Sequence, residues 1–309
     1  MQVPAHVEYE RAASVDQALA LLSRYAPGAM ILAGGHSLIP MMKLRLAQPE
    51  VLVDINPIAA LRYLERSGGQ LRIGALARHA DLLASAQAGE HFAILHDAER
   101  VIADPIVRNW GTIGGSLCQA DPSEDLSAAF AALEGSMIVH GPDGRREVSA
   151  REFHTGPYET IVGPAEMLTE IRLPIRAASG SAYLKVCRRA GDWPIGAAGA
   201  AVWLAGDRIE DVGIGLTAVG AAHFVAAEAE EFLRGQRADD ESFARAGEIA
   251  AEHCRPVADQ RGPVDYKRHL VRELTARVLR TAADRARGLA AAGGPAASGG
   301  PAASGGLAP

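Results

Sequence analysis

Two short stretches, far apart in the sequence, combine glycine with other small or polar residues and are candidates for ligand binding. The first is Gly34-Gly35-His36-Ser37-Leu38, and the second is Thr112-Ile113-Gly114-Gly115-Ser116. Glycine has no Cβ atom, so a ligand can approach the backbone closely at a glycine. Consecutive backbone N–H groups near the start of a helix bind phosphate. The chemistry indicated is therefore anion binding. Taken alone, the first stretch is equally consistent with an ordinary strand-to-helix turn capped by Ser37.

The two stretches together suit a long ligand with a diphosphate in its middle. Asp121, Ser123, Glu124 and Asp125 follow the second stretch, and such side chains suit ribityl or ribose hydroxyls. These features describe FAD better than a mononucleotide. The sequence contains no G-x-x-x-x-G-K-[ST] motif, and GIGLTAVG at 213–220 has the wrong spacing for the dinucleotide fingerprint.

Other reactive side chains show no grouping of their own. The histidines near 79, 91, 96 and 253 and the three cysteines lack metal-ligand spacing. We expect the cysteines to be reduced and buried, and three thiolates are too few for one ordinary iron–sulfur cluster. Trp193 is expected either to stack on a flavin ring or to lie in the core.

Composition excludes several classes of protein. The chain has 309 residues, a net charge of −6 and a pI near 5.9, which disfavours nucleic acid as a partner. It has no apolar run of about 18 residues and no signal-peptide pattern, so we expect no transmembrane segment and a cytoplasmic protein. The Ala/Gly/Pro/Ser segment 289–309 is expected to be disordered.

The first part of the chain alternates strands and helices. A helix at 14–25, a strand at 29–33, a helix at 38–46 and a strand at 51–55 predict parallel pairing. Further strands are expected near 63, at 71–74 and at 166–174, with helices at 80–85, 92–101 and 126–134. The segment 136–149 predicts a hairpin that turns at 141–144. After residue 180 we expect strands at 181–187, 198–204 and 209–219, then helices at 225–233, 239–253 and 264–287.

Several of these segments resemble one known family. AGGHSLIPMMKLRL with VLVDI, TIGGSLCQADPSEDL, EMLTEIRLP and YLKVCRRAGDW are similar to the FAD-binding medium subunit of molybdenum hydroxylases, which include xanthine dehydrogenase and aerobic carbon monoxide dehydrogenase. The resemblance implies an α+β fold: a two-subdomain FAD-binding domain of the vanillyl-alcohol-oxidase type at 1–177, divided into 1–55 and 56–177. A C-terminal domain of antiparallel sheet and helices at 178–288 would complete it.

The resemblance also implies which residues hold a non-covalent FAD. Residues 31–38 would wrap the diphosphate, Thr112 to Ser116 would form a second cradle, and Asp125 would accept from the flavin's hydroxyl-bearing part. Leu168 would lie near the isoalloxazine or adenine side and Ile102 near the ring, and Lys185 would correspond to a lysine of the xanthine dehydrogenase relatives. The full set expected to contact FAD is Ile31, Leu32, Ala33, Gly34, Gly35, His36, Ser37, Leu38, Ile102, Thr112, Ile113, Gly114, Gly115, Ser116, Asp125, Leu168, Lys185 and Trp193.

By the same resemblance the chain would be an electron-transfer subunit. A large molybdopterin subunit would oxidise the substrate and a small subunit with [2Fe-2S] clusters would relay electrons, in a dimer of heterotrimers. The flavin would pass them to a quinone, a cytochrome or NAD, with any membrane association made through the complex. Carbon monoxide is the expected substrate, and nicotinate, aldehyde or purine hydroxylation is the alternative. A stand-alone flavin oxidoreductase and a nucleotide-binding assembly module are the rivals.

Overall fold

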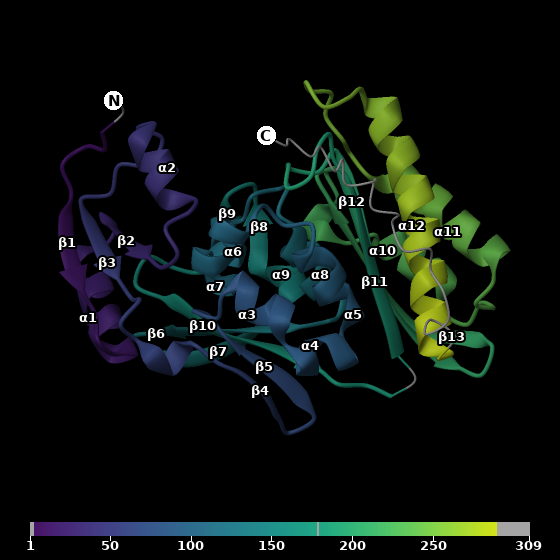
Figure 1. Ribbon diagram of the computed structural model, residues 1–309, viewed down its shortest axis with the longest axis horizontal. Helices are drawn as coiled ribbons and strands as arrows, with labels where there is room; N and C mark the ends of the chain where they lie inside the picture. The colour runs from purple at the N-terminus through teal and green to yellow at the C-terminus, as the bar shows by residue number, and fades with distance from the viewer. Residues whose placement is uncertain (1–2, 178, 289–309) are drawn as a thin grey trace, which may run out of the picture.

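The computed structural model describes residues 3–177 and 179–288, so the predicted tail lies outside the described residues. Three sheets of three or more strands follow one another across the molecule, from the N-terminal unit at the left of Figure 1 to the C-terminal unit at the right. Helices separate the second sheet from the third. The predicted α+β class, with an antiparallel C-terminal sheet and helices, is confirmed.

The N-terminal unit is a small parallel sheet. Its elements are β1 (Glu8–Arg11), α1 (Val15–Tyr25), β2 (Ala29–Leu32), α2 (Leu38–Lys43) and β3 (Val51–Asp54). The strand order is β1-β3-β2. The predicted parallel pairing of β2 with β3 is confirmed, and β1, which was not predicted, also pairs with β3 in parallel. The central strand β3 is buried along its whole length. Helix α2 ends at Lys43 rather than at Leu46, because Arg45 takes the left-handed conformation with φ +62°.

The second sheet has five antiparallel strands in the order β4-β5-β10-β6-β7. Their bounds are β4 (Leu64–Ser67), β5 (Gln70–Gly74), β6 (Ser136–Gly141), β7 (Gly144–Ser149) and β10 (Met167–Pro174). The predicted hairpin is confirmed as β6 and β7, joined at Pro142-Asp143. A short helix α9 (Ala150–Phe153) and the strands β8 (His154–Gly156) and β9 (Glu159–Thr160) lead into β10.

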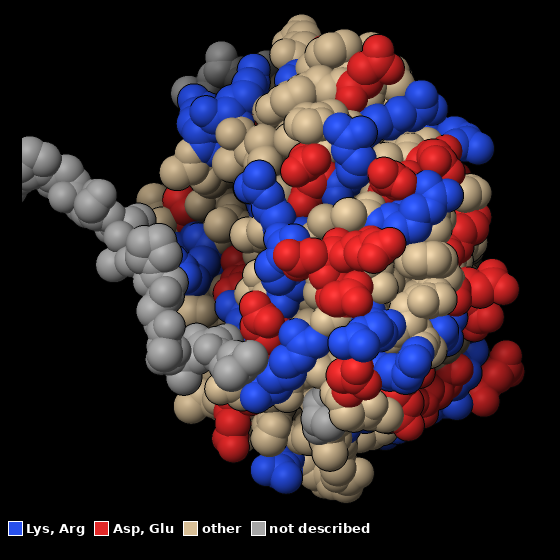
Figure 2. All heavy atoms as spheres, turned by 90° about the vertical axis from the view of Figure 1, so that its right-hand side faces the viewer, with Lys and Arg blue, Asp and Glu red and all other residues tan. Residues whose placement is uncertain are grey.

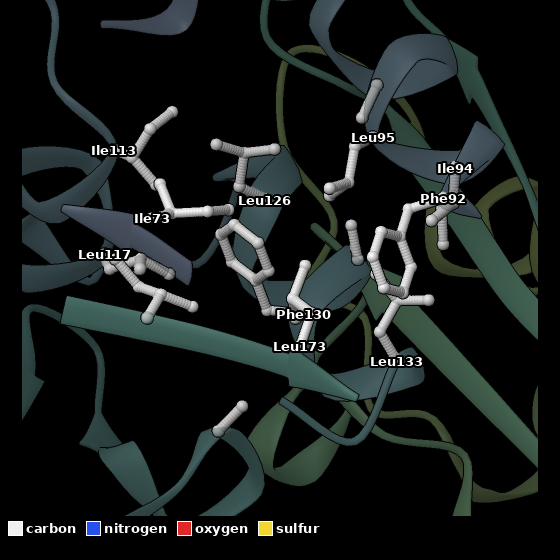
Figure 3. Packing of buried hydrophobic residues seen from close by; sticks show 14 of the residues in the cluster. Ile73, Phe92, Ile94, Leu95, Ile113, Leu117, Leu126, Phe130, Leu133 and Leu173 are labelled. Atoms are coloured by element: carbon white, nitrogen blue, oxygen red, sulfur yellow. The ribbon is translucent and has the colours of Figure 1, made fainter. Parts of the chain in front are cut away.

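Six helices lie beside this sheet: α3 (His79–Ala84), α4 (Ala86–His91), α5 (Ala93–Glu99), α6 (Pro105–Trp110), α7 (Ile113–Gln119) and α8 (Asp125–Ala132). Three of them, α4, α6 and α7, were not predicted. For α6 the sequence held a signal, since Asp104 caps the helix and Pro105 starts it. Figure 3 shows the core that these helices form with the sheet, where Ile73, Ile113, Leu117 and Phe130 point toward one another.

The third sheet packs helices against both of its faces. Its strands are β11 (Ser179–Val186), β12 (Gly196–Ala205) and β13 (Arg208–Thr217), in that order. Odd positions of β12, such as Ala201, belong to the core shared with α5 and α8, whereas even positions, such as Val202, belong to the C-terminal core. This two-sided burial explains why nine of the ten residues of β12 are buried.

The GIGLTAVG glycines have a packing role. A Cβ on Gly213 would lie 2.7 Å from the carbonyl carbon of Ala132, so β13 approaches α8 backbone to backbone. Gly215 packs against Ala128 in the same way.

Three α-helices follow in the part of the chain that the structure describes: α10 (Ala227–Leu233), α11 (Asp240–His253) and α12 (Val264–Ala286). The long amphipathic α12 packs on β11, β12 and α11, as predicted for a closing helix. Figure 2 shows acidic and basic side chains interspersed over this side of the molecule. Among the helices of the described ranges, none has the length and hydropathy to cross a membrane.

Candidate functional site

A cavity of about 560 Å³ lies where the three units meet. Its lining comes from the turn after β2, from α7 and the residues just before it, from 160–168 before and within β10, and from 185–193 after β11. The volume lies within the range of small-molecule and cofactor sites. Segments that are more than 150 residues apart in sequence therefore share one site.

The turn at 34–38 presents a run of unpaired backbone donors to this cavity. Within the described chain, the amides of Gly34, Gly35, His36, Ser37 and Leu38 donate to no protein acceptor, and all five residues line the cavity. Gly35 has φ +75°, which lets the backbone curl so that successive N–H groups converge. The Ser37 side chain makes no capping bond, contrary to the simple turn interpretation. The arrangement is an anion-binding one.

The two glycine-containing stretches meet through their backbones. A Cβ added to Gly34 would lie 2.9 Å from Gly111 Cα and 3.1 Å from the carbonyl carbon of Trp110. Since both neighbours are main-chain atoms, only glycine permits this approach. The two candidate regions therefore form one site.

The second stretch differs from the prediction in how it is built. It was expected to be a bend with free amides, but Thr112 caps α7 by accepting from Gly115 N at 3.1 Å. The amide of Ile113 donates to Ala77 O, and that of Gly114 donates to Ala75 O. These donors are consumed because the chain after β5 runs alongside. The expected cradle of free N–H groups at 113–116 is thus wrong, although Thr112, Gly115 and Ser116 line the cavity.

Asp125 stands at the junction with the C-terminal unit. Its carboxylate, which is almost fully buried, accepts from Tyr183 Oη at 2.6 Å and from Lys185 Nζ at 2.8 Å. Burial raises the pKa of Asp125 to about 6, while the lysine and tyrosine contacts oppose that rise. Asp125 and Lys185 both line the cavity as one ion pair.

Apolar and aromatic residues line the rest of the cavity. Leu168 sits at a register shift between β10 and β6, and Ile102 and Trp193 approach from separate loops. Trp193 is 47% exposed, so its interpretation as a core residue is wrong. The residues predicted to contact a ligand that do line the cavity are Ile31, Ala33, Gly34, Gly35, His36, Ser37, Leu38, Ile102, Thr112, Gly115, Ser116, Asp125, Leu168, Lys185 and Trp193. Leu32, Ile113 and Gly114 do not line it.

Sequence reasoning missed several lining residues. The segment from Thr160 to Pro164 carries no motif, and only its position before β10 brings it to the cavity. Cys118 also lines the cavity and is exposed, so the expectation that all cysteines are buried is wrong for this residue.

His79, one of the histidines without metal-ligand spacing in the sequence, pairs with a carboxylate in the interior. It lines the cavity and lies 3.0 Å from Glu99 through Nδ1, and both residues are buried. Burial raises the pKa of Glu99, and the Glu99 carboxylate raises the pKa of His79 against the opposing effect of burial.

Comparison with known families agrees with this geometry. The FAD binding domain in molybdopterin dehydrogenase matches residues 5–176, and the CO dehydrogenase flavoprotein C-terminal domain matches residues 181–282. This chain belongs to the FAD-binding medium subunits of the molybdopterin dehydrogenase family. The resemblance drawn from its motifs is confirmed.

Individual medium subunits are similar over nearly their full length. The carbon monoxide dehydrogenase medium chain of Hydrogenophaga pseudoflava is 38% identical over 91% of this chain and 98% of its own. The glyceraldehyde dehydrogenase medium chain of Sulfolobus acidocaldarius is 35% identical over 91% and 99%. A solved structure of the Hydrogenophaga pseudoflava carbon monoxide dehydrogenase superposes with a TM-score of 0.89, at 39% identity, over 92% of this chain and 99% of that chain.

Membership of this family gives the cavity a cofactor class. The chain is a flavin-binding subunit of a molybdenum hydroxylase and thus part of an FAD-dependent oxidoreductase. The five unpaired amides at 34–38 fit the anionic centre of a dinucleotide, and the apolar lining at Ile102, Leu168 and Trp193 fits its rings.

Proposed function

We propose that this chain holds FAD non-covalently in the cavity and relays electrons within a complex that oxidises carbon monoxide. The observation that carries the proposal is the run of five unpaired amides at 34–38, facing a cavity of about 560 Å³. These amides would hold the diphosphate. When bound, FAD accepts electron pairs and can pass electrons on singly.

The chain's own residues would bind and orient the cofactor. Thr112, Gly115 and Ser116 would form the opposite wall, and Ile102, Leu168 and Trp193 would exclude water from the rings. The Asp125 and Lys185 pair would offer a fixed charge pattern beside them, because Tyr183 locks the carboxylate from the interior. His36 would contact phosphate rather than carry a covalent flavin.

The partners in this proposal are a large molybdopterin subunit and a small [2Fe-2S] subunit, arranged as a dimer of heterotrimers. Within the described ranges no group of three or more potential metal-ligating side chains comes together, so the metal centres are assigned to the partners. The acceptor would be a quinone, a cytochrome or NAD. We place the complex in the cytoplasm, with any membrane contact made through other subunits.

Carbon monoxide is favoured because two medium chains of carbon monoxide dehydrogenases are 38% and 36% identical to this one. The glyceraldehyde relative follows at 35%, and the substrate would be selected in the large subunit. Another molybdenum hydroxylase is therefore the second candidate. We also propose domains at 1–177 and 178–288, a division consistent with the two matched families.

Purification of the full chain tests the flavin proposal. A yellow protein that releases intact FAD on denaturation, and that is reduced by dithionite but by no organic substrate, would support it. If an organic substrate reduced the flavin of the isolated chain, the chain would instead be a stand-alone oxidoreductase. A colourless protein that takes up no FAD would refute the proposal.

Matched glycine variants make the same test specific to the site. Gly35→Val and Gly69→Val both place a side chain at φ +75°, but only Gly35 lines the cavity, and nothing lies within 4 Å of the Gly69 position. We expect loss of FAD from the Gly35 variant alone. The substrate is tested by assaying the complete complex with carbon monoxide, purines and aldehydes.

A further inference from the structure

Arg78 is a buried cation without a carboxylate partner. The residue is 9% exposed, and across residues 3–177 and 179–288 its guanidinium makes no ion pair. Instead Nη2 donates to the amide oxygen of Asn56 at 3.0 Å, and Nη1 donates to the carbonyl oxygen of Trp110. Burial lowers the pKa of Arg78, but a guanidinium stays charged at neutral pH. A buried charge without an ion-pair partner is costly even when it is hydrogen-bonded, so its retention calls for a physical reason.

The two acceptors of Arg78 belong to two different segments, and both contact the chain at Ala33 and Gly34. Asn56 follows β3 and donates from Nδ2 to Ala33 O at 2.7 Å, immediately before the turn of unpaired amides. A second Asn56 Nδ2 contact, to Asp54 Oδ1 at 2.7 Å, fixes the amide. Trp110 belongs to the other segment, where its carbonyl lies against Gly34. The guanidinium therefore joins the N-terminal sheet to the segment that precedes α7.

Arg78 does not line the cavity itself. It is linked through Asn56 and Trp110 to the start of the turn whose five amides lack acceptors. The nearest acid on the helix that follows it, Asp81, accepts from the Arg78 backbone N–H and pairs with Arg62 at 3.4 Å. The buried positive charge and the unpaired N–H groups thus favour the same occupant, an anion at 34–38.

We propose that Arg78 is a positioning residue for the diphosphate of the bound dinucleotide. It would fix the separation of the two walls through Asn56 and Trp110, and it would add a buried positive charge close to the amide turn. The inference rests on the proposed function, since it requires that FAD occupies this cavity. It predicts that Arg78 contributes to binding of the phosphate-bearing part of the ligand and little to binding of the isoalloxazine.

Ligands with and without phosphate separate these contributions. The full chain, freed of flavin, is titrated with FAD, ADP and riboflavin in the wild type, Arg78→Gln and Arg78→Lys. For Arg78→Gln we expect FAD and ADP to bind about 10- to 100-fold more weakly, with riboflavin changed by less than about twofold. Arg78→Lys keeps the charge but lacks the fork that reaches both acceptors, so its loss should be intermediate.

Arg62→Gln is the matched control. It removes the same charge from a side chain that is 56% exposed and close to Arg78, and we expect all three affinities to stay within about twofold of the wild type. The loss in Arg78→Gln should persist at high salt, because a buried charge is screened little.

Equal weakening of FAD, ADP and riboflavin would overturn the inference, because it would mean that Arg78 only keeps the cavity in shape. Unchanged affinities would overturn it as well. If Arg78→Gln does not fold, the test is the ratio of ADP affinity to riboflavin affinity in Arg78→Lys, compared with the same ratio in the wild type. A ratio at least threefold lower than in the wild type supports the inference, and a smaller change refutes it. Failure of the wild-type chain to bind FAD would refute the proposed function, whereas equal FAD binding by wild type and variants would refute only the role of Arg78.

Discussion

Replacing Gly34 by alanine would insert a methyl group where the two walls of the flavin site touch. The new Cβ would lie 2.9 Å from Gly111 Cα and 3.1 Å from the Trp110 carbonyl carbon, and closer still to that carbonyl's oxygen. Ordinary contacts of a Cβ begin at about 3.4 Å. The neighbours are backbone atoms that cannot rotate away, so the walls must separate by about 0.5 Å or more.

The free energy of unfolding and the free energy of FAD binding should both change. Overpacking of a tight contact costs about 1–3 kcal/mol of unfolding free energy. Displacing the turn also moves its amides away from the positions where they bind phosphate. The loss of one hydrogen bond to a charged group, about 1.5–3 kcal/mol, would weaken FAD binding by about 10- to 100-fold.

Urea unfolding with and without FAD measures both effects. At a free FAD concentration of 100 times the wild-type Kd, bound FAD should add about 2.7 kcal/mol to wild-type stability. The same concentration should add only about 0.4–1.4 kcal/mol to Gly34→Ala. Gly89→Ala, in α4 with nothing within 4 Å of its added Cβ, should leave the FAD increment unchanged.

Two results would refute this reasoning. Wild-type stability in flavin-free Gly34→Ala would show that the two walls are not in contact. Reduced stability with the full FAD increment would show that the 34–38 amides do not hold the diphosphate.

Three further predictions concern the interior. Burial raises the pKa of Asp125 to about 6, so between about pH 4 and pH 6 the native chain binds a proton more tightly than the unfolded chain, and the unfolding free energy falls as pH rises through this window. Asp125→Asn should flatten this dependence of the unfolding free energy on pH, measured by urea titrations. An unchanged slope would contradict the assignment to Asp125. His79→Leu should lower the unfolding free energy by about 3–5 kcal/mol, because it leaves the Glu99 carboxylate buried without a partner. The double variant with Glu99→Leu should recover most of that unfolding free energy. Additive losses of the two single variants in a double-mutant cycle would argue against the buried pair. Gly213→Ala should lower the unfolding free energy by at least about 1–3 kcal/mol, since its Cβ would lie 2.7 Å from a backbone carbon of α8, and stability equal to that of Gly89→Ala would refute the close approach.

Local features of the protein follow from short stretches of its sequence. Three features depend on neighbours within a few positions, and the structure reproduces them: the start of the first helix, which Ser14 caps, the hairpin turn at 141–144, and the alternation of strands and helices before residue 55. The glycine at position 35 belongs to the same group, because φ +75° is a local requirement. The family resemblance rests on such short motifs, which is why the amino-acid sequence is enough to indicate it.

Long-range packing sets which backbone groups are free to bind a ligand. The two glycine-containing stretches look alike in sequence, yet the amides at 34–38 are unpaired while those of Ile113 and Gly114 are consumed by Ala77 and Ala75. Whether an N–H group is available depends on which carbonyl the fold places opposite it, and those carbonyls lie more than 30 residues away in sequence.

The same reason applies to charge. Asp125 gains its partners Tyr183 and Lys185 from a strand about 60 residues later. The lack of an ion pair at the Arg78 guanidinium, within residues 3–177 and 179–288, is likewise a property of the packed chain. Residue type gives the charge of a side chain, but burial and long-range neighbours set its energy. The sequence therefore determined the elements and the family, and the packing of the three units determined the site.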